Sequence, residues 1–459
     1  MAMRHVIVGG GPAGWYGLET IRLFDRDSPV TFISDEPAYA RMVLPYYMAG
    51  EIPEAQVFTG SDRYFAQMKV EPVFGRRVTA VDATRRTLTL DNGQAVHFET
   101  LLIATGSSPA RLPVPGAELD GVHTLWTLED ARRAIKLAKK GARVLFVGAG
   151  FIGFIILNAL HKVGCQLSVV EVERQVLPRM LDAKGAELVQ GWLAAQKVET
   201  YCGTSVKEIA RGADGRKVVT LADGRQLIAD LVILATGIRP NLDLVKGSGI
   251  RVNQGILVDE RMQTSAPGIY AAGDVAEGPD LSTGQQAIHA IQPTAIDHGR
   301  VAGANMAGRD VRYAGSLLMN ILDVCGLQCV SYGLWREERR EITLLLNPAR
   351  PIYRKLIWEG DQVVGAIFIG PAEDVCMLND VGMVKGLIQT KTRLGPWKAH
   401  LQKNPLDIRK PYVATNTAAA LLKQSILGQA SEERRFRYRD LAPGTTPAHE
   451  GIFVGRPPA

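Results

Sequence analysis

The chain has 459 residues, too many for one ordinary domain, and typical domain sizes predict about three. It is 46% hydrophobic and 22% charged, as soluble globular proteins are. The net charge of +6 arises at the C-terminal end, where residues 391–459 hold 12 Lys and Arg against 5 Asp and Glu; the rest has no basic excess, so nucleic-acid binding is not expected.

The first predicted element is a short apolar strand at residues 5–8, which leads directly into a glycine-rich turn and a helix. In the GxGxxG spacing, the first glycine permits a tight turn, the second lets backbone approach a pyrophosphate, and the third lets the helix pack on the strand. The next apolar strand ends in two acids, where a ribose can be bound. The pattern therefore predicts a dinucleotide site. Its residues are Gly9, Gly11, Pro12, Ala13, Gly14, Asp35 and Glu36.

Alternating segments with hairpin turns follow this first unit. Residues 85–98 alternate between apolar and polar side chains around an Asp-Asn-Gly sequence typical of a hairpin turn. Residues 101–109 are an apolar strand that runs into Ala-Thr-Gly and a proline-bearing loop. The same succession returns at 217–241, with a turn at Asp-Gly and a second Ala-Thr-Gly. This repetition predicts two diverged copies of one nucleotide-binding unit.

The second unit has its own strand, glycine turn and acid. Residues 143–147 lead into another GxGxxG, and the next strand ends at Glu171, where a carboxylate accepts the ribose hydroxyls of NAD and repels a 2′-phosphate. NAD is favoured, although the nearby Arg174 leaves NADP open. The apolar run at 144–157 is shorter than the roughly 20 residues of a spanning helix, so no membrane span is expected. The predicted NAD-binding residues are Gly148, Gly150, Phe151, Ile152, Gly153, Glu171 and Gly237.

The C-terminal third changes in character. Residues 267–274 form an apolar strand ending in Ala-x-Gly-Asp, a chain reversal where a carboxylate can bind a polyol. After about residue 313 the glycine patterns stop, and alternating segments such as 351–370 predict an antiparallel α+β domain. From Pro396 onwards prolines interrupt the chain, and only residues 415–427 are predicted to be helical.

The cysteines and the N-terminus indicate a reducing compartment. The five cysteines are odd in number and form no CxxC pair, so neither a disulfide framework nor a metal site is predicted. Cys325 and Cys329 lie in an apolar stretch and are expected to be core residues rather than a redox pair. The N-terminus lacks the length and cleavage site of a secretory signal. We therefore expect a cytoplasmic location.

The ordered set of two GxGxxG turns, two Ala-Thr-Gly loops and Ala-x-Gly-Asp resembles the two-dinucleotide flavoproteins. This family includes the pyridine nucleotide–disulfide reductases, NADH oxidases, ferredoxin and rubredoxin reductases, and the flavin part of nitrite reductase. The resemblance implies an α/β fold of two Rossmann-like three-layer domains, one for FAD and one for NAD(H), with a C-terminal α+β interface domain that forms a homodimer. The expected domains are 1–112 with 242–312 (FAD), 113–241 (NAD), 313–395 (interface) and a basic extension at 396–459.

The resemblance assigns further residues to FAD. An arginine in the Tyr-Ala-Arg sequence would lie along the cofactor, the first Ala-Thr-Gly loop would close over it, and the Gly-Asp pair would bind the ribityl chain. A residue of the Pro-Thr-Ala sequence falls where the family backbone approaches the flavin ring. These residues are Arg41, Thr105, Gly106, Gly273, Asp274 and Ala295.

Two departures from the family pattern narrow the expected chemistry. Residues 39–50 contain no cysteine, so the thiol relay of disulfide reductases is absent. Many relatives also carry a Lys–Glu pair beside the flavin where this chain has Tyr46 and Ile155, which suggests a less polar nicotinamide pocket. The sequence most resembles a cysteine-less subgroup of NADH oxidase-like and ferredoxin reductase-like proteins. Members of it serve as flavin subunits of larger enzymes, as in tungsten-dependent aldehyde oxidoreductases.

The predicted function is an FAD-dependent oxidoreductase that moves electrons between NAD(H) and a partner protein bearing an iron–sulfur or metal cofactor. Hydride transfer between nicotinamide and flavin requires no acid or base, so no catalytic residue is named. The basic extension is a candidate dock for the partner. Two alternatives remain: a stand-alone NADH oxidase that reduces dioxygen, and a nucleotide-bound structural or sensing subunit.

Overall fold

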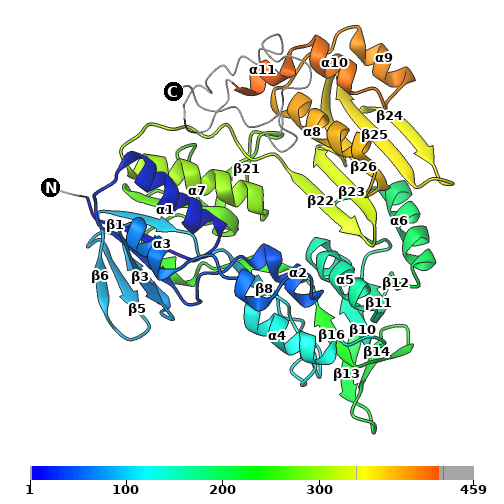
Figure 1. Ribbon diagram of the computed structural model, residues 1–459, viewed down its shortest axis with the longest axis horizontal. Coiled ribbons are helices and arrows are strands. Elements are labelled where there is room, and N and C mark those ends of the chain that lie inside the picture. Colours follow the sequence, from blue (N-terminus) through cyan, green and yellow to red (C-terminus); the bar gives the residue numbers. More distant parts are fainter. Residues whose placement is uncertain (1–2, 337–338, 423–426, 428–459) are drawn as a thin grey trace, which may run out of the picture.

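The computed structural model describes residues 3–336, 339–422 and 427 (Figure 1). Its N-terminal part is built on a parallel five-stranded sheet in the order β19-β7-β1-β2-β3. The apolar strand predicted before the first glycine turn is the middle strand, and all four of its residues are buried. The strands are β1 (His5–Val8), β2 (Val30–Ser34), β3 (Val70–Phe74), β7 (Thr100–Ile103) and β19 (Ile269–Ala271).

Two helices and a small antiparallel sheet complete this unit. Helices α1 (Pro12–Phe24) and α7 (Gln292–Met306) lie side by side against the parallel sheet (Figure 1). The hairpin predicted at residues 85–98 is confirmed, with Gly93 in the left-handed region at a φ of 81°. The antiparallel strands are β4 (Val78–Asp82), β5 (Thr87–Leu90) and β6 (Ala95–His97).

The central part repeats this plan, as the internal repetition predicted. Its parallel sheet has the order β12-β11-β10-β16-β9, and the second glycine turn follows the middle strand. The apolar run at 144–157 is this middle strand and the helix after it, and no helix within the described residues is long and apolar enough to cross a membrane. The elements are β9 (Val122–His123), α4 (Leu128–Leu137), β10 (Arg143–Val147), α5 (Phe151–Val163), β11 (Gln166–Glu171), α6 (Ala183–Ala195), β12 (Glu199–Cys202), β13 (Val206–Arg211), β14 (Lys217–Leu221), β15 (Gln226–Ala229) and β16 (Leu231–Leu234).

The third part is the antiparallel α+β unit predicted after residue 313. One face of its sheet packs on the central part, and the other face packs on α8 (Val375–Gln389). Cys325 and Cys329 are buried in the first of these interfaces, which confirms them as core residues. In the described part of the chain all five cysteines are free. The strands, in the order β22-β23-β26-β25-β24, are β22 (Met319–Val324), β23 (Leu327–Gly333), β24 (Glu341–Asn347), β25 (Ile352–Glu359) and β26 (Gln362–Pro371).

Three short helices continue this unit beyond Pro396. The expectation that only residues 415–427 would be helical was wrong, because α9 (Trp397–Lys403) and α10 (Arg409–Ala414) precede α11 (Thr417–Leu422). Pro396 and Pro411 stand at a helix start and in a first turn, where a missing N–H costs nothing, so prolines here begin helices rather than prevent them. Leu401 and Ile408 are fully buried with α8.

A partly buried ion pair joins the central and C-terminal parts. Asp182 caps α6 by accepting a hydrogen bond from the backbone of Gly185 at 3.0 Å. The same carboxylate pairs with the Lys355 ammonium at 2.7 Å and accepts the Tyr353 hydroxyl at 2.7 Å, both from β25. The indole of Trp192 adds a bond to the carbonyl of Val324 at 3.1 Å. The third unit is therefore attached to the central one by specific polar contacts as well as by apolar packing.

A buried carboxyl in α8 makes stability depend on pH. Burial raises the pKa of Asp380 to about 6, against the opposing charge of Arg354. Because the folded pKa lies above the unfolded one, the cost of burying Asp380 is absent below about pH 4 and grows as the pH rises through 6, so its contribution lowers stability over that range. We expect Asp380→Asn to stabilise the protein above pH 6 by about 2 kcal/mol, with no advantage at pH 4.

Thermal unfolding midpoints at pH 4, 5, 6 and 7 test this expectation. An exposed control, Asp120→Asn, should follow the wild-type protein at every pH, because its side chain is surrounded by water. A constant difference between Asp380→Asn and wild type at all four pH values would show that folding does not raise the pKa of Asp380.

Candidate functional site

In the first glycine turn, the first and third glycines are tightly packed, whereas the space beside the second is open. Gly9 has a φ of 117°, and a Cβ there would lie 2.1 Å from the carbonyl oxygen of Ala104. A Cβ on Gly14 would lie 2.1 Å from the carbonyl oxygen of Gly9. Gly11 has no neighbouring atom within 4 Å of its Cβ position, at the N-terminus of α1. The first N–H groups of a helix have no partner within it, so an open space at a helix N-terminus fits an anionic pyrophosphate.

The two acidic side chains after β2 have different partners. Glu36 accepts the hydroxyl of Tyr39 at 2.8 Å and pairs with the guanidinium of Arg41. Asp35 is exposed and pairs with Arg77 at 2.8 Å. The structure therefore groups Glu36 with Arg41 and leaves Asp35, also predicted to bind FAD, outside this group.

Several of the other predicted FAD residues meet where α1, α7 and the Gly-Asp turn converge. Gly273 has a φ of 77°, and its Cβ position lies 3.2 Å from the Ala13 methyl and 3.5 Å from the Ala295 methyl. The next residue, Asp274, accepts the hydroxyl of Ser107 at 2.7 Å. Burial raises the pKa of Asp274, and the serine bond opposes that shift. A carboxylate held at this convergence can accept hydrogen bonds from a polyol.

The two Ala-Thr-Gly loops contact each other. Strand β8 (Ser107–Pro109) follows the first loop and pairs antiparallel with β17 (Ile238–Pro240), which follows the second. Asn241 strengthens this junction, because its amide donates to the carbonyl of Thr105 at 2.8 Å and its backbone N–H donates to Gly106 at 3.0 Å. The loops that the sequence assigned to two separate cofactors thus form one hydrogen-bonded crossover between the domains.

The second glycine turn repeats the geometry of the first. A Cβ on Gly148, whose φ is 106°, would lie 2.4 Å from the carbonyl oxygen of Ala235, whereas the Cβ position of Gly150 has no atom within 4 Å. Gly153 is tight, at 3.0 Å from the carbonyl of Gly148. Phe151 and Ile152 begin α5 and are half-buried. This turn therefore offers a second open anion site at a helix N-terminus.

A buried carboxylate stands beside the second turn. Glu171 accepts the backbone N–H of Ala149 at 2.6 Å and that of Glu173 at 3.0 Å, which fixes it at the end of β11. Arg174 is exposed. Gly237 has a φ of 121° in the crossover loop, a conformation that favours glycine. The residues around this turn fit the adenosine half of NAD(H).

The positions of the missing Lys–Glu pair lie on two packed helices. Tyr46, in α2 (Leu44–Met48), has half of its surface exposed, and Ile155 is half-buried in α5. An ion pair between Glu51 and Lys162, 2.6 Å long, joins the same region two helical turns further along α5. The prediction of a less polar nicotinamide pocket stays a prediction.

Several residues that shape the site were not found from the sequence. Helices α1 and α7 cross closely because Gly299 and Gly303 face α1; Cβ atoms there would lie 2.3 Å from the Ala13 carbonyl and 2.5 Å from the Gly17 carbonyl. Their four-residue spacing is a usable signal for helix contact. Ser107 and Trp126 carried no such signal, because their contacts depend on distant parts of the chain.

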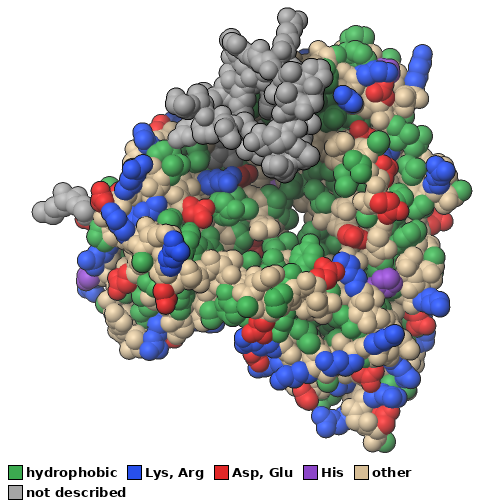
Figure 2. All heavy atoms as spheres, viewed as in Figure 1, with side chains coloured by type: hydrophobic (Ala, Val, Ile, Leu, Met, Phe, Trp, Pro, Cys, Tyr) green, Lys and Arg blue, Asp and Glu red, His purple; other side chains and the backbone are tan. Residues whose placement is uncertain are grey.

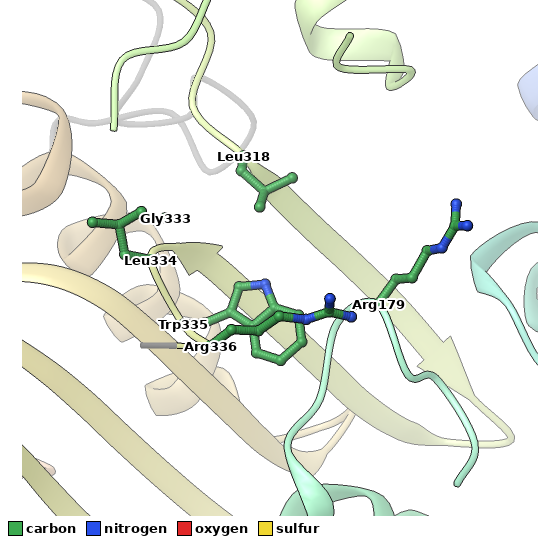
Figure 3. A pocket seen from close by; sticks show the side chains of 6 residues that line it. All are labelled: Arg179, Leu318, Gly333, Leu334, Trp335 and Arg336. Carbon is green, nitrogen blue, oxygen red and sulfur yellow. The ribbon is translucent and has the colours of Figure 1, made fainter. Parts of the chain in front are cut away.

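An open pocket of about 310 Å³ lies between the central and C-terminal parts (Figure 3). Arg336 lies over the ring of Trp335, with its guanidinium 4.7 Å from the ring centroid, and also contacts the carbonyl of Pro178. The lining residues are Arg179, Leu318, Gly333, Leu334, Trp335 and Arg336. On the face seen in Figure 2, Lys and Arg side chains are mixed with Asp and Glu. Its charge pattern therefore does not indicate a nucleic-acid surface.

Comparisons with known proteins agree with this geometry. Residues 3–295 match the pyridine nucleotide-disulphide oxidoreductase family, and residues 319–381 match the rubredoxin NAD+ reductase C-terminal domain. The chain is 32% identical over 412 residues to the NADH-dependent phenylglyoxylate dehydrogenase subunit epsilon of Aromatoleum evansii, covering 88% of this chain and 96% of that one. It is 30% identical to the NADH oxidase of Methanocaldococcus jannaschii, with coverages of 79% and 83%.

Solved structures show the same fold. The NAD-dependent persulfide reductase from A. fulgidus superposes with a TM-score of 0.79 at 28% identity, covering 92% of this chain and 84% of that one. Putidaredoxin reductase, in its covalent complex with putidaredoxin, gives a TM-score of 0.82 at 23% identity, with coverages of 91% and 100%.

Two Rossmann-like domains with paired glycine turns and a C-terminal antiparallel sheet define an oxidoreductase that uses FAD and NAD(H). The chain belongs to the pyridine nucleotide–disulphide oxidoreductase family. The expected fold class, enzyme class and cofactors are thereby confirmed.

Proposed function

We propose that this protein is an NADH-linked flavin subunit that exchanges electrons with a partner protein bearing an iron–sulfur or metal cofactor. The observation that carries the proposal is the pair of glycine turns, each with open space at its second glycine, joined by hydrogen-bonded crossover loops. The similarity to a subunit of an NADH-dependent dehydrogenase, over 88% of this chain, supports the assignment to a larger enzyme.

The N-terminal turn would hold FAD. Gly11 leaves room for the pyrophosphate, Glu36 offers acceptors for the ribose, and Arg41 supplies a cation alongside. Asp274 offers an acceptor for the ribityl hydroxyls, with Ser107 holding it in place. When bound, FAD supplies a carrier that takes a hydride and releases single electrons. The chain's own part is to bind and orient.

The second turn would hold NAD(H). Gly150 leaves room for its pyrophosphate, and Glu171 accepts the adenosine ribose hydroxyls while repelling a 2′-phosphate. The crossover of β8 with β17 sets the distance between the two domains, because it ties the loops after both sheets together. Orientation of this kind is sufficient for hydride exchange and explains why no acid or base need be sought.

The finer features of the proposal follow from the sequence. We assign the chain to the subgroup without a redox cysteine. Within that subgroup, one role that we propose for it is the flavin subunit of a tungsten aldehyde oxidoreductase complex. Burial raises the pKa of the Cys325 thiol to about 12, which suits a core residue rather than a relay. Free cysteines favour a cytoplasmic location. We also propose that the third domain forms a homodimer interface.

We propose the domain division 1–112 with 242–312, 113–241 and 313–395. Strands β19 and β1, from the two parts of the first domain, share one sheet, which supports that split. Residues 397–422 of the proposed extension pack with the third domain. Residues 428–459 of this extension lie outside the described residues, and the role of the whole basic extension, 396–459, as a partner dock stays a prediction.

Anaerobic titration of the purified protein, followed by oxidised-flavin absorbance, tests the proposed function. NADH should bleach the flavin promptly, NADPH should bleach it little at the same concentration, and reoxidation in air should be slow. Absence of bleaching by either nucleotide would overturn the proposal and favour a nucleotide-bound structural or sensing subunit.

A stand-alone NADH oxidase is the second candidate. The similarity to a protein named NADH oxidase, at 30% identity, favours it. The oxidase hypothesis predicts a different result in one measurement. Air would reoxidise the reduced protein rapidly, and the isolated chain would turn over NADH aerobically.

A further inference from the structure

Trp126 belongs by sequence to the central unit, but its side chain contacts the N-terminal one. It lies two residues before α4, and its indole N–H donates to the carbonyl oxygen of Ser107 at 2.9 Å. The guanidinium of Arg41 lies 5.6 Å from the centroid of its ring. Its backbone N–H donates to the carboxylate of Asp130 at 3.1 Å, and the same Asp130 forms the capping box of α4. The tryptophan is therefore held from several sides.

Both side-chain contacts lead to carboxylates assigned to FAD. Ser107, whose carbonyl accepts the indole, donates its hydroxyl to Asp274 at 2.7 Å. Arg41, which lies over the ring, pairs with Glu36. Trp126 thus stands in the middle of a chain of contacts that runs from the ribose carboxylate to the ribityl carboxylate.

A second bridge joins the same helix start to Glu36. Tyr39 donates its hydroxyl to Glu36 at 2.8 Å and accepts the backbone N–H of Leu128 at 3.2 Å. Burial raises the pKa of Tyr39 to about 12, so its hydroxyl stays protonated and able to donate. The start of α4 is therefore linked to Glu36, which would bind the ribose, in two ways: from Trp126 through Arg41, and from Leu128 through Tyr39.

We propose that Trp126 is a positioning residue for FAD. Trp126 holds Arg41 and Ser107 in place, so that Glu36 and Asp274 face the cofactor hydroxyls. The inference rests on the proposed placement of FAD in the N-terminal turn. It has one consequence beyond binding: because Trp126 is carried by the start of α4, FAD occupancy and the seating of the central domain on the N-terminal domain are coupled.

Titration of the FAD-free full-length protein with FAD, followed by tryptophan and flavin fluorescence, tests this role. Trp126→Phe keeps an aromatic ring under Arg41 and loses the bond to Ser107, so we expect FAD affinity to fall by about 3- to 10-fold. Trp126→Leu loses both contacts and should weaken binding by about 10- to 50-fold. The visible circular dichroism of the bound flavin should change in the same order.

Control variants separate positioning from simple destabilisation. Trp397→Phe changes a half-buried tryptophan in α9, which contacts His400 and is remote from the two glycine turns in sequence, and it should leave FAD affinity unchanged. The unfolding midpoint of FAD-free Trp126→Phe should stay close to wild type, whereas a purely structural role would lower it without changing the flavin spectrum. In a double-mutant cycle, Arg41→Met should cost less in the Trp126→Leu background than in wild type.

Three results would overturn the role of Trp126. They are wild-type FAD affinity in Trp126→Leu, additive effects of the Trp126 and Arg41 changes, and an unchanged flavin spectrum with a lowered unfolding midpoint. A wild-type protein that bound no FAD would instead refute the proposed function itself. The two failures are therefore distinguishable.

Discussion

A Gly14→Ala variant is expected to purify with little or no FAD and to unfold at a clearly lower temperature than the wild-type protein. The added methyl would lie 2.1 Å from the carbonyl oxygen of Gly9, a backbone atom that cannot turn aside. Helix α1 would have to move off β1, and such overpacking typically costs about 1–3 kcal/mol. Flavin absorbance of the purified protein and its unfolding midpoint give the result directly.

Gly11→Ala is the matched control for this effect, three residues away in the same turn. Its Cβ position has no atom within 4 Å, and its φ of −82° and ψ of 179° suit alanine, so the FAD-free protein should unfold at or above the wild-type temperature. FAD affinity should nevertheless fall by at least about 10-fold, because the methyl occupies the space left for the pyrophosphate. Full FAD affinity in Gly11→Ala would place the cofactor elsewhere.

The fold could be predicted from the sequence because its determinants are local. Each glycine turn sits between an apolar strand and a helix, and each acid follows at the end of the next strand, so short segments contain the whole signal. The hairpins at Gly93 and Gly224 are equally local and were found at the predicted places. Long, repeated patterns of this kind leave few alternative topologies.

The parts that escaped prediction depend on contacts between distant residues. The pairing of β8 with β17 joins segments about 130 residues apart, and nothing within either loop indicates the other. Trp126 owes its role to Ser107 and Arg41, which the sequence gives no reason to place beside it. Asp35 and Glu36 were both predicted to bind FAD, and their different partners, Arg77 and Arg41, could not be read from the sequence.

The preference for NADH over NADPH should depend on Glu171. In Glu171→Gln the side chain keeps its shape but loses its charge, and one of its two backbone bonds, to Ala149 or to Glu173, is lost because the amide nitrogen cannot accept. We expect KM for NADH to rise by about 10- to 100-fold, as charge-assisted hydrogen bonds to the ribose weaken. With the repulsion of a 2′-phosphate removed, the ratio of kcat/KM for NADH over NADPH should fall by a similar factor.

The kinetic pattern distinguishes binding from damage to the enzyme. A carboxylate that holds the adenosine ribose binds substrate and transition state equally, so KM should rise while kcat and FAD content stay at wild-type values. Glu173→Gln, two residues along and exposed, is the matched control and should leave both constants unchanged. Because Glu171 also fixes Ala149 within the glycine turn, an equal rise in KM for NADH and NADPH would mean that its main task is to shape the turn. An unchanged KM for NADH would place the ribose away from β11.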